Sequence, residues 1–310
     1  MNVLITGAGG FLGKYIAEEF LGMNFEVFGV DVIPSNAHHL NKAVHYMEIQ
    51  LPNEALRSAI QQVKPDLCIH CAGTSSVAAS LNDPRADFCS SVVLAEQLLA
   101  FLGQEVPECK CVFLSSAAVY GQPEQLPVAE NAPIRPLSPY GYHKRLCELL
   151  FEQAARIQGK QTAILRIFSA YGPGLKKQVL WESVAQLATG RQVCLKGTGL
   201  ESRDFVYASD IARAVGVVCN KSLFQGDIYN LGSGQETTIA EAVEELTKLF
   251  PGLPPPLFKG ESISGDPQRW RADCSLLESL GFKSTIPMDQ GLARLAEWAK
   301  NQMREPLVKG

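Results

Sequence analysis

Tyr140 and Lys144 stand four residues apart in the segment SPYGYHK, and together they could perform acid–base chemistry. Residues at this spacing share one face of a helix, and Ser138 followed by Pro139 is typical of a helix start. A nearby ammonium group favours the phenolate form of a tyrosine, which can then accept a proton. Tyr142 has no lysine four residues after it. The Tyr140–Lys144 pair therefore predicts a general acid–base, although the same spacing also occurs on solvated helix faces.

Two serines, Ser115 and Ser116, end the apolar segment VFLSS at residues 112–116. In sheets of parallel strands, ligands bind at the carboxyl ends of the strands. A hydroxyl group there could orient a substrate oxygen against Tyr140. The alternative is a serine that only caps the turn after the strand.

Three glycines, Gly7, Gly10 and Gly13, follow an apolar strand and open a helix in the segment TGAGGFLG. The first allows a tight turn, the second lets the backbone approach a phosphate, and the third lets the helix pack close to the strand. The helix N-terminus offers N–H groups and a positive dipole end to an anion. The run predicts a phosphate cradle, with a purely structural loop as the alternative.

Asp31 ends the next strand-like segment, FEVFGVD. A carboxylate at this place accepts hydrogen bonds from both ribose hydroxyls of an adenosine and repels a 2′-phosphate. No arginine or lysine stands beside it in DVIPSN. Asp31 therefore favours NAD over NADP as the cofactor, unless it is an ordinary surface turn residue.

The segments that must position these residues alternate between strand and helix patterns up to about residue 170. The predicted strands are 2–6, 25–31, 66–73, 109–116 and 162–168, and the predicted helices are 11–23, 53–63, 85–104 and 138–157. Strands separated by helices pair in parallel, so the fold class is α/β with a Rossmann-like, doubly wound parallel sheet.

The alternation stops after Pro173, where turn-rich segments follow. We predict a Rossmann-like dinucleotide-binding domain at 1–171 and a smaller C-terminal substrate-binding lobe formed by 172–202 and 233–310. Residues 203–232 are expected to return to the sheet.

Composition narrows the class of protein. A net charge of −4 provides no general attraction to nucleic acid or to an anionic membrane, and no run of ~18 apolar residues predicts a membrane span. The nine cysteines are scattered through apolar segments, which indicates a reduced, cytoplasmic protein. The CxxC pair Cys68 and Cys71 lies in a predicted strand and is expected to be core packing. No histidine grouping suggests a metal site.

The chain resembles the extended short-chain dehydrogenase/reductase family of NAD-dependent nucleotide-sugar epimerases and dehydratases over nearly its full length. The segments that carry the resemblance are TGAGGFLG, PDLCIHCAG, LSSAAVYG, SPYGYHK, LRIFSAYGPG, RDFVYASDIARA, YNLGSG and GDPQRWRAD. The resemblance implies that Ser116 is the catalytic hydroxyl, Tyr140 the base, and Lys144 its partner and a ligand of the nicotinamide ribose. It also implies a homodimer built through the helices at 85–104 and 138–157.

The resemblance also implies binding residues for a cofactor and for a nucleoside-diphosphate sugar. Together with the glycine run and Asp31, the predicted cofactor contacts are Gly7, Gly10, Phe11, Leu12, Gly13, Asp31, Gln50, Leu51, Ala72, Gly73, Tyr140 and Lys144. The predicted substrate contacts are Ser75, Ser116, Ser169, Arg203 and Arg269, with the two arginines at the diphosphate. Residues 193–196 resemble the segment that runs beside the nucleoside base.

Several positions depart from the family pattern. Ser169 stands where the family usually has Asn, and Gln50 stands where an Asp is common beside the adenine. Ala117 and Ala118 replace the Asp–Glu pair with which 4,6-dehydratases protonate and deprotonate the sugar. Since alanine can do neither, 4,6-dehydratase activity is not expected.

We therefore predict an NAD-dependent nucleotide-sugar epimerase that acts at C4 by transient hydride transfer through a 4-keto intermediate. The alternatives within the family are a reductase of a 4-keto sugar nucleotide and a decarboxylase of a nucleoside-diphosphate uronate. A non-catalytic nucleotide-binding member is a third possibility, but such a chain would be expected to have lost at least one of Ser116, Tyr140 and Lys144.

Overall fold

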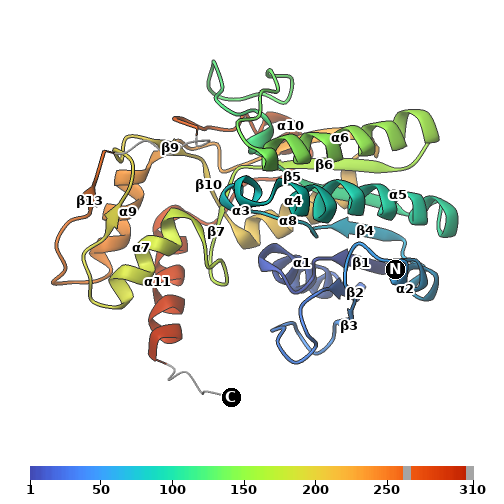
Figure 1. Cartoon of the computed structure of the whole chain (residues 1–310), viewed down its shortest axis with the longest axis horizontal. Coiled ribbons are helices and arrows are strands. Elements are labelled where there is room, and N and C mark those ends of the chain that lie inside the picture. The colour runs from blue at the N-terminus through green and yellow to red at the C-terminus, as the bar shows by residue number, and fades with distance from the viewer. Residues whose placement is uncertain (261–266, 305–310) are drawn as a thin grey trace.

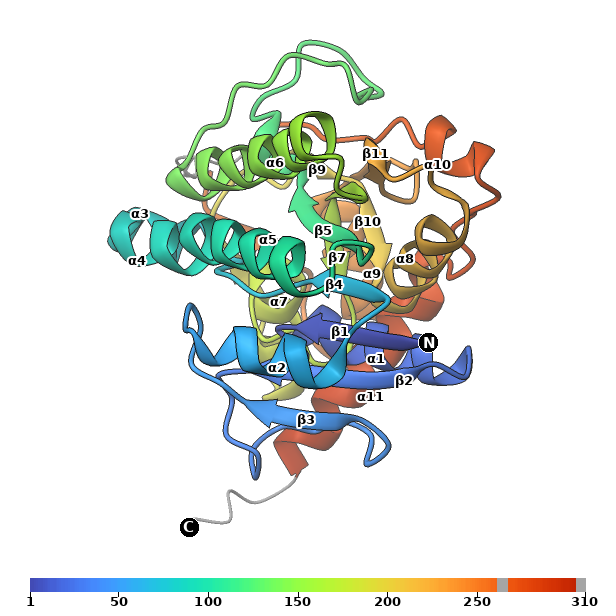
Figure 2. The same cartoon turned by 90° about the vertical axis from the view of Figure 1, so that its right-hand side faces the viewer.

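A seven-stranded sheet forms the centre of the computed structural model, which describes residues 1–260 and 267–304. Its strand order is β11-β6-β5-β4-β1-β2-β3, and every neighbouring pair is parallel. The strands are β1 (Asn2–Thr6), β2 (Glu26–Asp31), β3 (His45–Glu48), β4 (Leu67–His70), β5 (Lys110–Ser116), β6 (Thr162–Ile167) and β11 (Gln225–Leu231). Figure 2 shows them stacked from β3 at the bottom through β1 and β4 to β5.

Helices cover both faces of this sheet, as Figure 1 shows. One face carries α1 (Phe11–Gly22), α8 (Ala208–Lys221) and α10 (Ser275–Ser279). The other carries α2 (Ala55–Val63), α5 (Leu94–Glu105) and α6 (Pro139–Gln158). The predicted doubly wound Rossmann-like architecture is therefore confirmed.

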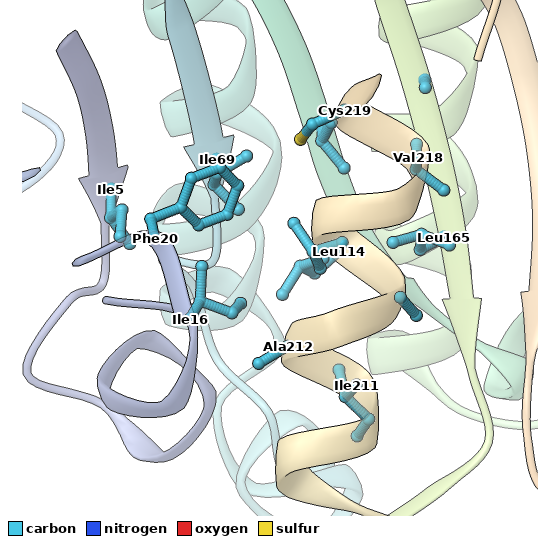
Figure 3. Packing of buried hydrophobic residues seen from close by; sticks show 14 of the residues in the cluster. Ile5, Ile16, Phe20, Ile69, Leu114, Leu165, Ile211, Ala212, Val218 and Cys219 are labelled. Atoms are coloured by element: carbon cyan, nitrogen blue, oxygen red, sulfur yellow. The ribbon is translucent and has the colours of Figure 1, made fainter. Parts of the chain in front are cut away.

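The strands direct alternate side chains to the two faces. Ile5 of β1 packs with Phe20 of α1 and with residues of α8 in the cluster of Figure 3, whereas Leu4 joins the opposite cluster, which includes Phe151 of α6. All four of these named side chains are fully buried. Because the strands are held from both sides, their carboxyl ends provide a rigid edge for a site. The strand order reverses between β1 and β4, which is where ligands bind in such sheets.

A smaller lobe with its own core lies beside this edge, at the left of Figure 1. Its helices are α7 (Gln178–Ala188), α9 (Ile239–Lys248) and α11 (Met288–Arg304), and they bury residues such as Val184, Val243 and Leu295. Its short strands are β8 (Cys194–Leu195), which pairs with β13 (Leu257–Phe258), and β9 (Ser202–Arg203), which pairs with β12 (Thr237–Thr238). A further pair, β7 (Ser169–Tyr171) with β10 (Phe205–Tyr207), connects the lobe to the sheet.

Residues 203–232 supply β10, α8 and β11. Helix α10 lies within the segment 233–310, which we predicted to belong to the lobe, but it packs against the sheet instead. Leu277 of α10 and the nearby Phe282 are buried in the core of the sheet, on the face that α1 and α8 cover.

The predicted helix 85–104 is longer and less regular than expected. It runs through α4 (Pro84–Phe88), a π-helical turn η1 (Cys89–Val93) and α5. The short helix α3 (Val77–Asn82) precedes it, and a 3₁₀ turn η2 (Ala117–Val119) follows β5. By length and composition Pro84–Glu105 is the one helix, among those described, that could cross a membrane, but half of its apolar stretch is buried in the fold. We therefore interpret Pro84–Glu105 as a core helix of the fold.

Candidate active site

A cleft of about 1480 Å³ lies between the carboxyl edge of the sheet and the lobe. It exceeds the ~300–1,000 Å³ of a typical small-molecule pocket, so it has room for two ligands side by side. All but one of the predicted binding and catalytic residues line it, namely Gly7, Gly10, Phe11, Leu12, Gly13, Asp31, Gln50, Leu51, Ala72, Gly73, Ser75, Ser116, Tyr140, Lys144, Ser169 and Arg203.

The glycine run forms a tight cradle at the start of α1. Gly7 adopts φ +73°, and a Cβ there would lie 2.7 Å from the backbone nitrogen of Ala72. A Cβ on Gly13 would lie 2.2 Å from the Gly7 carbonyl oxygen, so only glycine lets α1 pack this close to the loop. Helix α1 begins after Gly10 without a side-chain cap. Its first-turn N–H groups are therefore available to an anion such as a pyrophosphate.

Asp31 is held beside this cradle at the end of β2, with 7% of its surface exposed. Its Oδ2 accepts a hydrogen bond from the Gly9 N–H at 2.9 Å, and its Oδ1 accepts one from the Val32 N–H at 2.7 Å. The backbone thus fixes the direction of the carboxylate. Asp31 lines the cleft, where it can receive ribose hydroxyls.

The two adjacent serines of β5 have different surroundings. The Ser115 hydroxyl is buried and donates to Glu148 Oε1 at 2.7 Å. Ser116 caps η2, where its Oγ accepts from the Ala118 N–H at 3.2 Å, and its side chain borders the cleft. Both serines line the cleft, but the Ser115 hydroxyl is engaged with Glu148, so we expect Ser116 to present its hydroxyl to a ligand.

Helix α6 brings Tyr140 to the same place. The Ser138 hydroxyl caps the helix by accepting from the Gly141 N–H at 3.2 Å. A Cβ on Gly141 would lie 2.6 Å from the Ala118 carbonyl oxygen, so α6 packs directly on η2. The Tyr140 N–H donates to the Ser80 hydroxyl of α3 at 3.1 Å. Tyr142 points away, with 58% of its surface exposed.

The ammonium group of Lys144 lies between the tyrosine and the sheet. Its Nζ donates to the Leu114 carbonyl at 2.9 Å and lies 5.9 Å from the centre of the Tyr140 ring. Lys144 is only 7% exposed, so little water screens its charge. Burial, and to a smaller extent the Lys144 charge, lower the pKa of the neighbouring His70 to about 3, so His70 is neutral at physiological pH.

On the lobe side, Arg203 reaches the cleft and Arg269 does not. Arg203 is 7% exposed and donates from Nη1 to the Pro267 carbonyl at 2.8 Å. Arg269 forms a two-pronged ion pair with Glu236, at 2.7 and 2.9 Å, and its side chain is 63% exposed. Trp270, the next residue, lines the cleft instead. Successive side chains of an extended segment point to opposite sides, so the chain presents Trp270 and turns Arg269 outward.

Sequence reasoning did not identify Lys177, whose side chain also lines the cleft. It stands in the loop segment GLKKQ beside a second lysine, and no periodic pattern distinguishes the two. Only the placement of the loop shows which one faces inward.

Two cysteines, Cys71 and Cys194, line the cleft individually. Cys68 is fully buried in β4, and all nine cysteines are free. Within residues 1–260 and 267–304, no group of three or more His, Cys, Asp or Glu side chains could hold a metal ion.

Comparison with known proteins finds a matching family model and relatives that cover nearly the whole chain. A model of the "NAD dependent epimerase/dehydratase family" matches residues 3–232. A Methanocaldococcus jannaschii protein, provisionally named a UDP-glucose 4-epimerase, is 31% identical over 97% of this chain and 99% of its own. The Thermotoga maritima UDP-glucose 4-epimerase, solved with UDP-glucose, is 25% identical with a TM-score of 0.90, covering 98% of this chain and all of its own. The Thermus thermophilus UDP-glucose 4-epimerase, solved with NAD, is 27% identical with a TM-score of 0.87, covering 97% and 99%.

Proposed function

This chain belongs to the NAD-dependent epimerase/dehydratase family, and from that premise we propose that it is an NAD-dependent 4-epimerase of UDP-sugars. Two solved relatives, one with UDP-glucose bound and the other with NAD bound, resemble it over nearly the whole length. The convergence of Ser116, Tyr140 and Lys144 in one cleft with the glycine cradle is the observation that carries the proposal.

The residues present fit the cofactor. The uncapped N-terminus of α1 and the glycine cradle suit the pyrophosphate of NAD, and Asp31 suits its adenosine ribose. Gln50, Leu51, Ala72 and Gly73 line the same part of the cleft. When bound, NAD supplies a group that accepts a hydride from carbon and returns it.

Tyr140 is the general acid–base of the proposed reaction. Its phenolate takes the proton of the C4 hydroxyl as that carbon is oxidised to a ketone, and returns the proton when the opposite face of the ketone is reduced. The Lys144 ammonium stabilises the phenolate, and the Ser116 hydroxyl holds the C4 oxygen at the base. Between the two transfers the 4-keto sugar must turn over in the cleft.

Substrate binding is assigned to residues on both sides of the cleft. Arg203 is proposed to bind the diphosphate, with Ser169 and Ser75 at the sugar. Arg269 is engaged with Glu236, so a contact with the diphosphate would require this pair to open. Ala118 lines the cleft beside Ser116 and carries no carboxylate, which leaves 4,6-dehydration without its acid and base.

Substitution of Tyr140 by phenylalanine tests the mechanism. Loss of the phenol removes general acid–base catalysis, which contributes about 10²–10⁴-fold, so kcat should fall by that factor with little change in UDP binding. Interconversion of UDP-glucose and UDP-galactose is followed by proton NMR. Tyr142→Phe, on the exposed side of α6, is the matched control and should match the wild type. Equal rates for Tyr140→Phe and wild type would refute the mechanism.

We further propose how the chain is divided and where it works. Residues 1–171 and 203–232 hold the cofactor, whereas 172–202 and 233–310, apart from α10, hold the nucleotide sugar. The free and mostly buried cysteines support a cytoplasmic location.

A homodimer is proposed through the helices α3, α4 and α6. These helices and η1 lie side by side and leave an apolar face exposed, to which Leu81, Phe88, Val93, Leu146 and Leu149 contribute. An exposed apolar surface spread over adjoining helices is typical of an interface between subunits.

A further inference from the structure

Lys177, just before α7, is a cation inside the cleft to which the proposed reaction gives no task. Its Nζ donates to the Ser75 carbonyl oxygen at 2.8 Å and also to the Ser75 hydroxyl. Ser75 lies between β4 and α3, so this contact crosses from the lobe to the sheet. Both residues line the cleft.

The surroundings of Lys177 are unfavourable for a cation. Burial lowers the pKa of Lys177, and the charge of Lys144 lowers it further. The partners found for its ammonium group in the described parts of the chain are neutral oxygens of Ser75, and none of the carboxylates described there lies within ion-pair distance. An ammonium group that is desolvated and repelled by a like charge is stabilised when an anion binds to it.

The position of Lys177 identifies which part of a substrate it meets. Ser75, which holds its ammonium group, stands just before α3, and the Ser80 hydroxyl of α3 accepts a hydrogen bond from the Tyr140 N–H at 3.1 Å, so Lys177 lies at the end of the cleft where Tyr140 acts. The proposed diphosphate ligand, Arg203, has other neighbours: its guanidinium carbon lies 5.6 Å from the centre of the Trp270 ring, and its Nη1 donates to the Pro267 carbonyl at 2.8 Å. Lys177 is therefore placed at the sugar.

The backbone holds Lys177 in this direction. The next residue, Gln178, has φ +69°, a left-handed conformation that residues other than glycine rarely adopt. Such conformations persist where the surrounding structure imposes them and are concentrated at ligand sites.

We propose that Lys177 binds a carboxylate on the sugar, and that the preferred substrate is accordingly a nucleoside-diphosphate uronate. In a pyranose uronate the carboxyl carbon is attached to C5, next to the C4 carbon at which the proposed reaction occurs. A cation that recognises this carboxylate must lie near the base, as Lys177 does. The inference rests on the proposed 4-epimerase function and specifies its substrate class. Before substrate binds, Ser75 holds the ammonium group in place.

Lys177→Met tests the inference, with Lys176→Met as the matched control. Lys176 is exposed, and its Nζ donates to Gln302 at 3.1 Å. NMR time courses give kcat/KM for UDP-glucuronate and for UDP-glucose. The wild type should prefer the uronate. Lys177→Met should lower kcat/KM for the uronate by about 10- to 150-fold, the range for loss of a charged hydrogen bond. It should change the value for UDP-glucose by less than about 3-fold, and Lys176→Met should change neither.

Binding of UDP alone, measured by calorimetry, separates the other roles of Lys177. An unchanged affinity for UDP in Lys177→Met supports the inference, whereas an equal loss for UDP and for the uronate would place Lys177 at the diphosphate and overturn it. If Lys177→Met lowered kcat/KM equally for UDP-glucuronate and for UDP-glucose, the contact with Ser75 would be merely structural. That result would also overturn the inference. A wild-type protein that epimerises UDP-glucose but not the uronate contradicts this inference alone, and one that epimerises neither contradicts the proposed function.

Discussion

Neighbouring residues of one type have separate roles in this cleft, because position along an element decides which way each side chain points. Both Ser115 and Ser116 line the cleft, but the Ser115 hydroxyl donates to Glu148, whereas the Ser116 Oγ, one residue further along β5, accepts from the Ala118 N–H. Tyr140 faces the cleft and Tyr142 faces solvent. In a strand and in a helix alike, a shift of one or two residues changes the face. The chemistry therefore depends on register as much as on residue type.

His70 shows how a charge in the cleft affects stability. It is 1% exposed, its Nδ1 is hydrogen-bonded to the Thr6 hydroxyl at 2.7 Å, and its Nε2 has no partner among the described residues. Burial first, and Lys144 second, lower its pKa to about 3. The ring is therefore kept neutral beside the ammonium group of Lys144.

We expect His70 to make the fold sensitive to acid. Its folded pKa of about 3 is below the 6.5 of a histidine in the unfolded chain, so its stabilising contribution is complete above pH 6.5 and is lost as pH falls toward 3. Between pH 7 and pH 5 the wild type should lose about 2 kcal/mol of unfolding free energy through this residue. Urea unfolding at the two pH values measures the loss. His70→Gln should show a correspondingly smaller loss, and His45→Gln, at an exposed site, should behave like the wild type. An identical pH dependence in His70→Gln and wild type would contradict the assignment.

At the scale of elements, α6 does most of the positioning. Its residue Glu148 is fully buried and accepts from Arg166 of β6 at 2.9 Å through each carboxylate oxygen, and from Ser115 of β5. Removing one partner of a buried ion pair typically costs about 3–5 kcal/mol, because the other charge is left unpaired. This pairing holds α6 to two strands and so holds Tyr140 and Lys144 in position.

Gly141 sets how closely α6 approaches η2, and its replacement by alanine tests that spacing. The added Cβ would lie 2.6 Å from the Ala118 carbonyl oxygen, so the start of α6 must move away from Ser116. Misplacement of reacting groups by about 1 Å can cost about 10²-fold in rate. We expect epimerisation of UDP-sugars to fall by this order while circular dichroism still reports a folded protein. Gly22→Ala is the control, since a Cβ there meets nothing within 4 Å and α1 should tolerate it. Full activity in Gly141→Ala would show that α6 is not restrained there.

Five of the sheet strands could be predicted from the sequence because they are marked apolar runs, whereas β3, a four-residue strand with no buried residue, was not predicted and β11 was expected only within the segment 203–232. The sheet strands buried on both faces read as apolar runs, and Ser138 with Pro139 marked the start of α6. Prediction was weakest where an element is too short to have a periodic sequence pattern. The strands β8, β9, β12 and β13 have two residues each, α3 has six, and the directions of Arg269 and Lys177 depend on extended loops. In such segments tertiary contacts decide the outcome, as the pairing of Arg269 with Glu236 illustrates.

At the scale of the whole molecule, the cleft is a boundary between two separately packed cores. The sheet supplies the cofactor cradle and the acid–base group, and the lobe supplies Arg203 and Lys177. Relative movement of two such bodies is the usual expectation when the contact between them is limited. The Lys177–Ser75 contact bridges them at the reacting end.

The proposed dimer makes a prediction at the same scale. Replacing both Leu146 and Leu149 by lysine puts two charges on the apolar face of α6, where they would be desolvated in an interface. Light scattering after gel filtration should then report one chain in place of two. Leu223→Lys, which is 75% exposed in the segment before β11, is the control and should leave the mass unchanged. A wild type that elutes as one chain would refute the dimer.

The chain passes from the sheet to the lobe at β7 and returns to the sheet only at α8 and β11. During synthesis on a ribosome, β6 therefore has an unpaired edge for the time needed to add the residues up to 231. An uncovered parallel strand is prone to pairing with other chains. The growing protein is thus most vulnerable to aggregation just before β11 emerges, and translation of residues 168–224, which include α7 of the lobe and α8, sets the length of that interval.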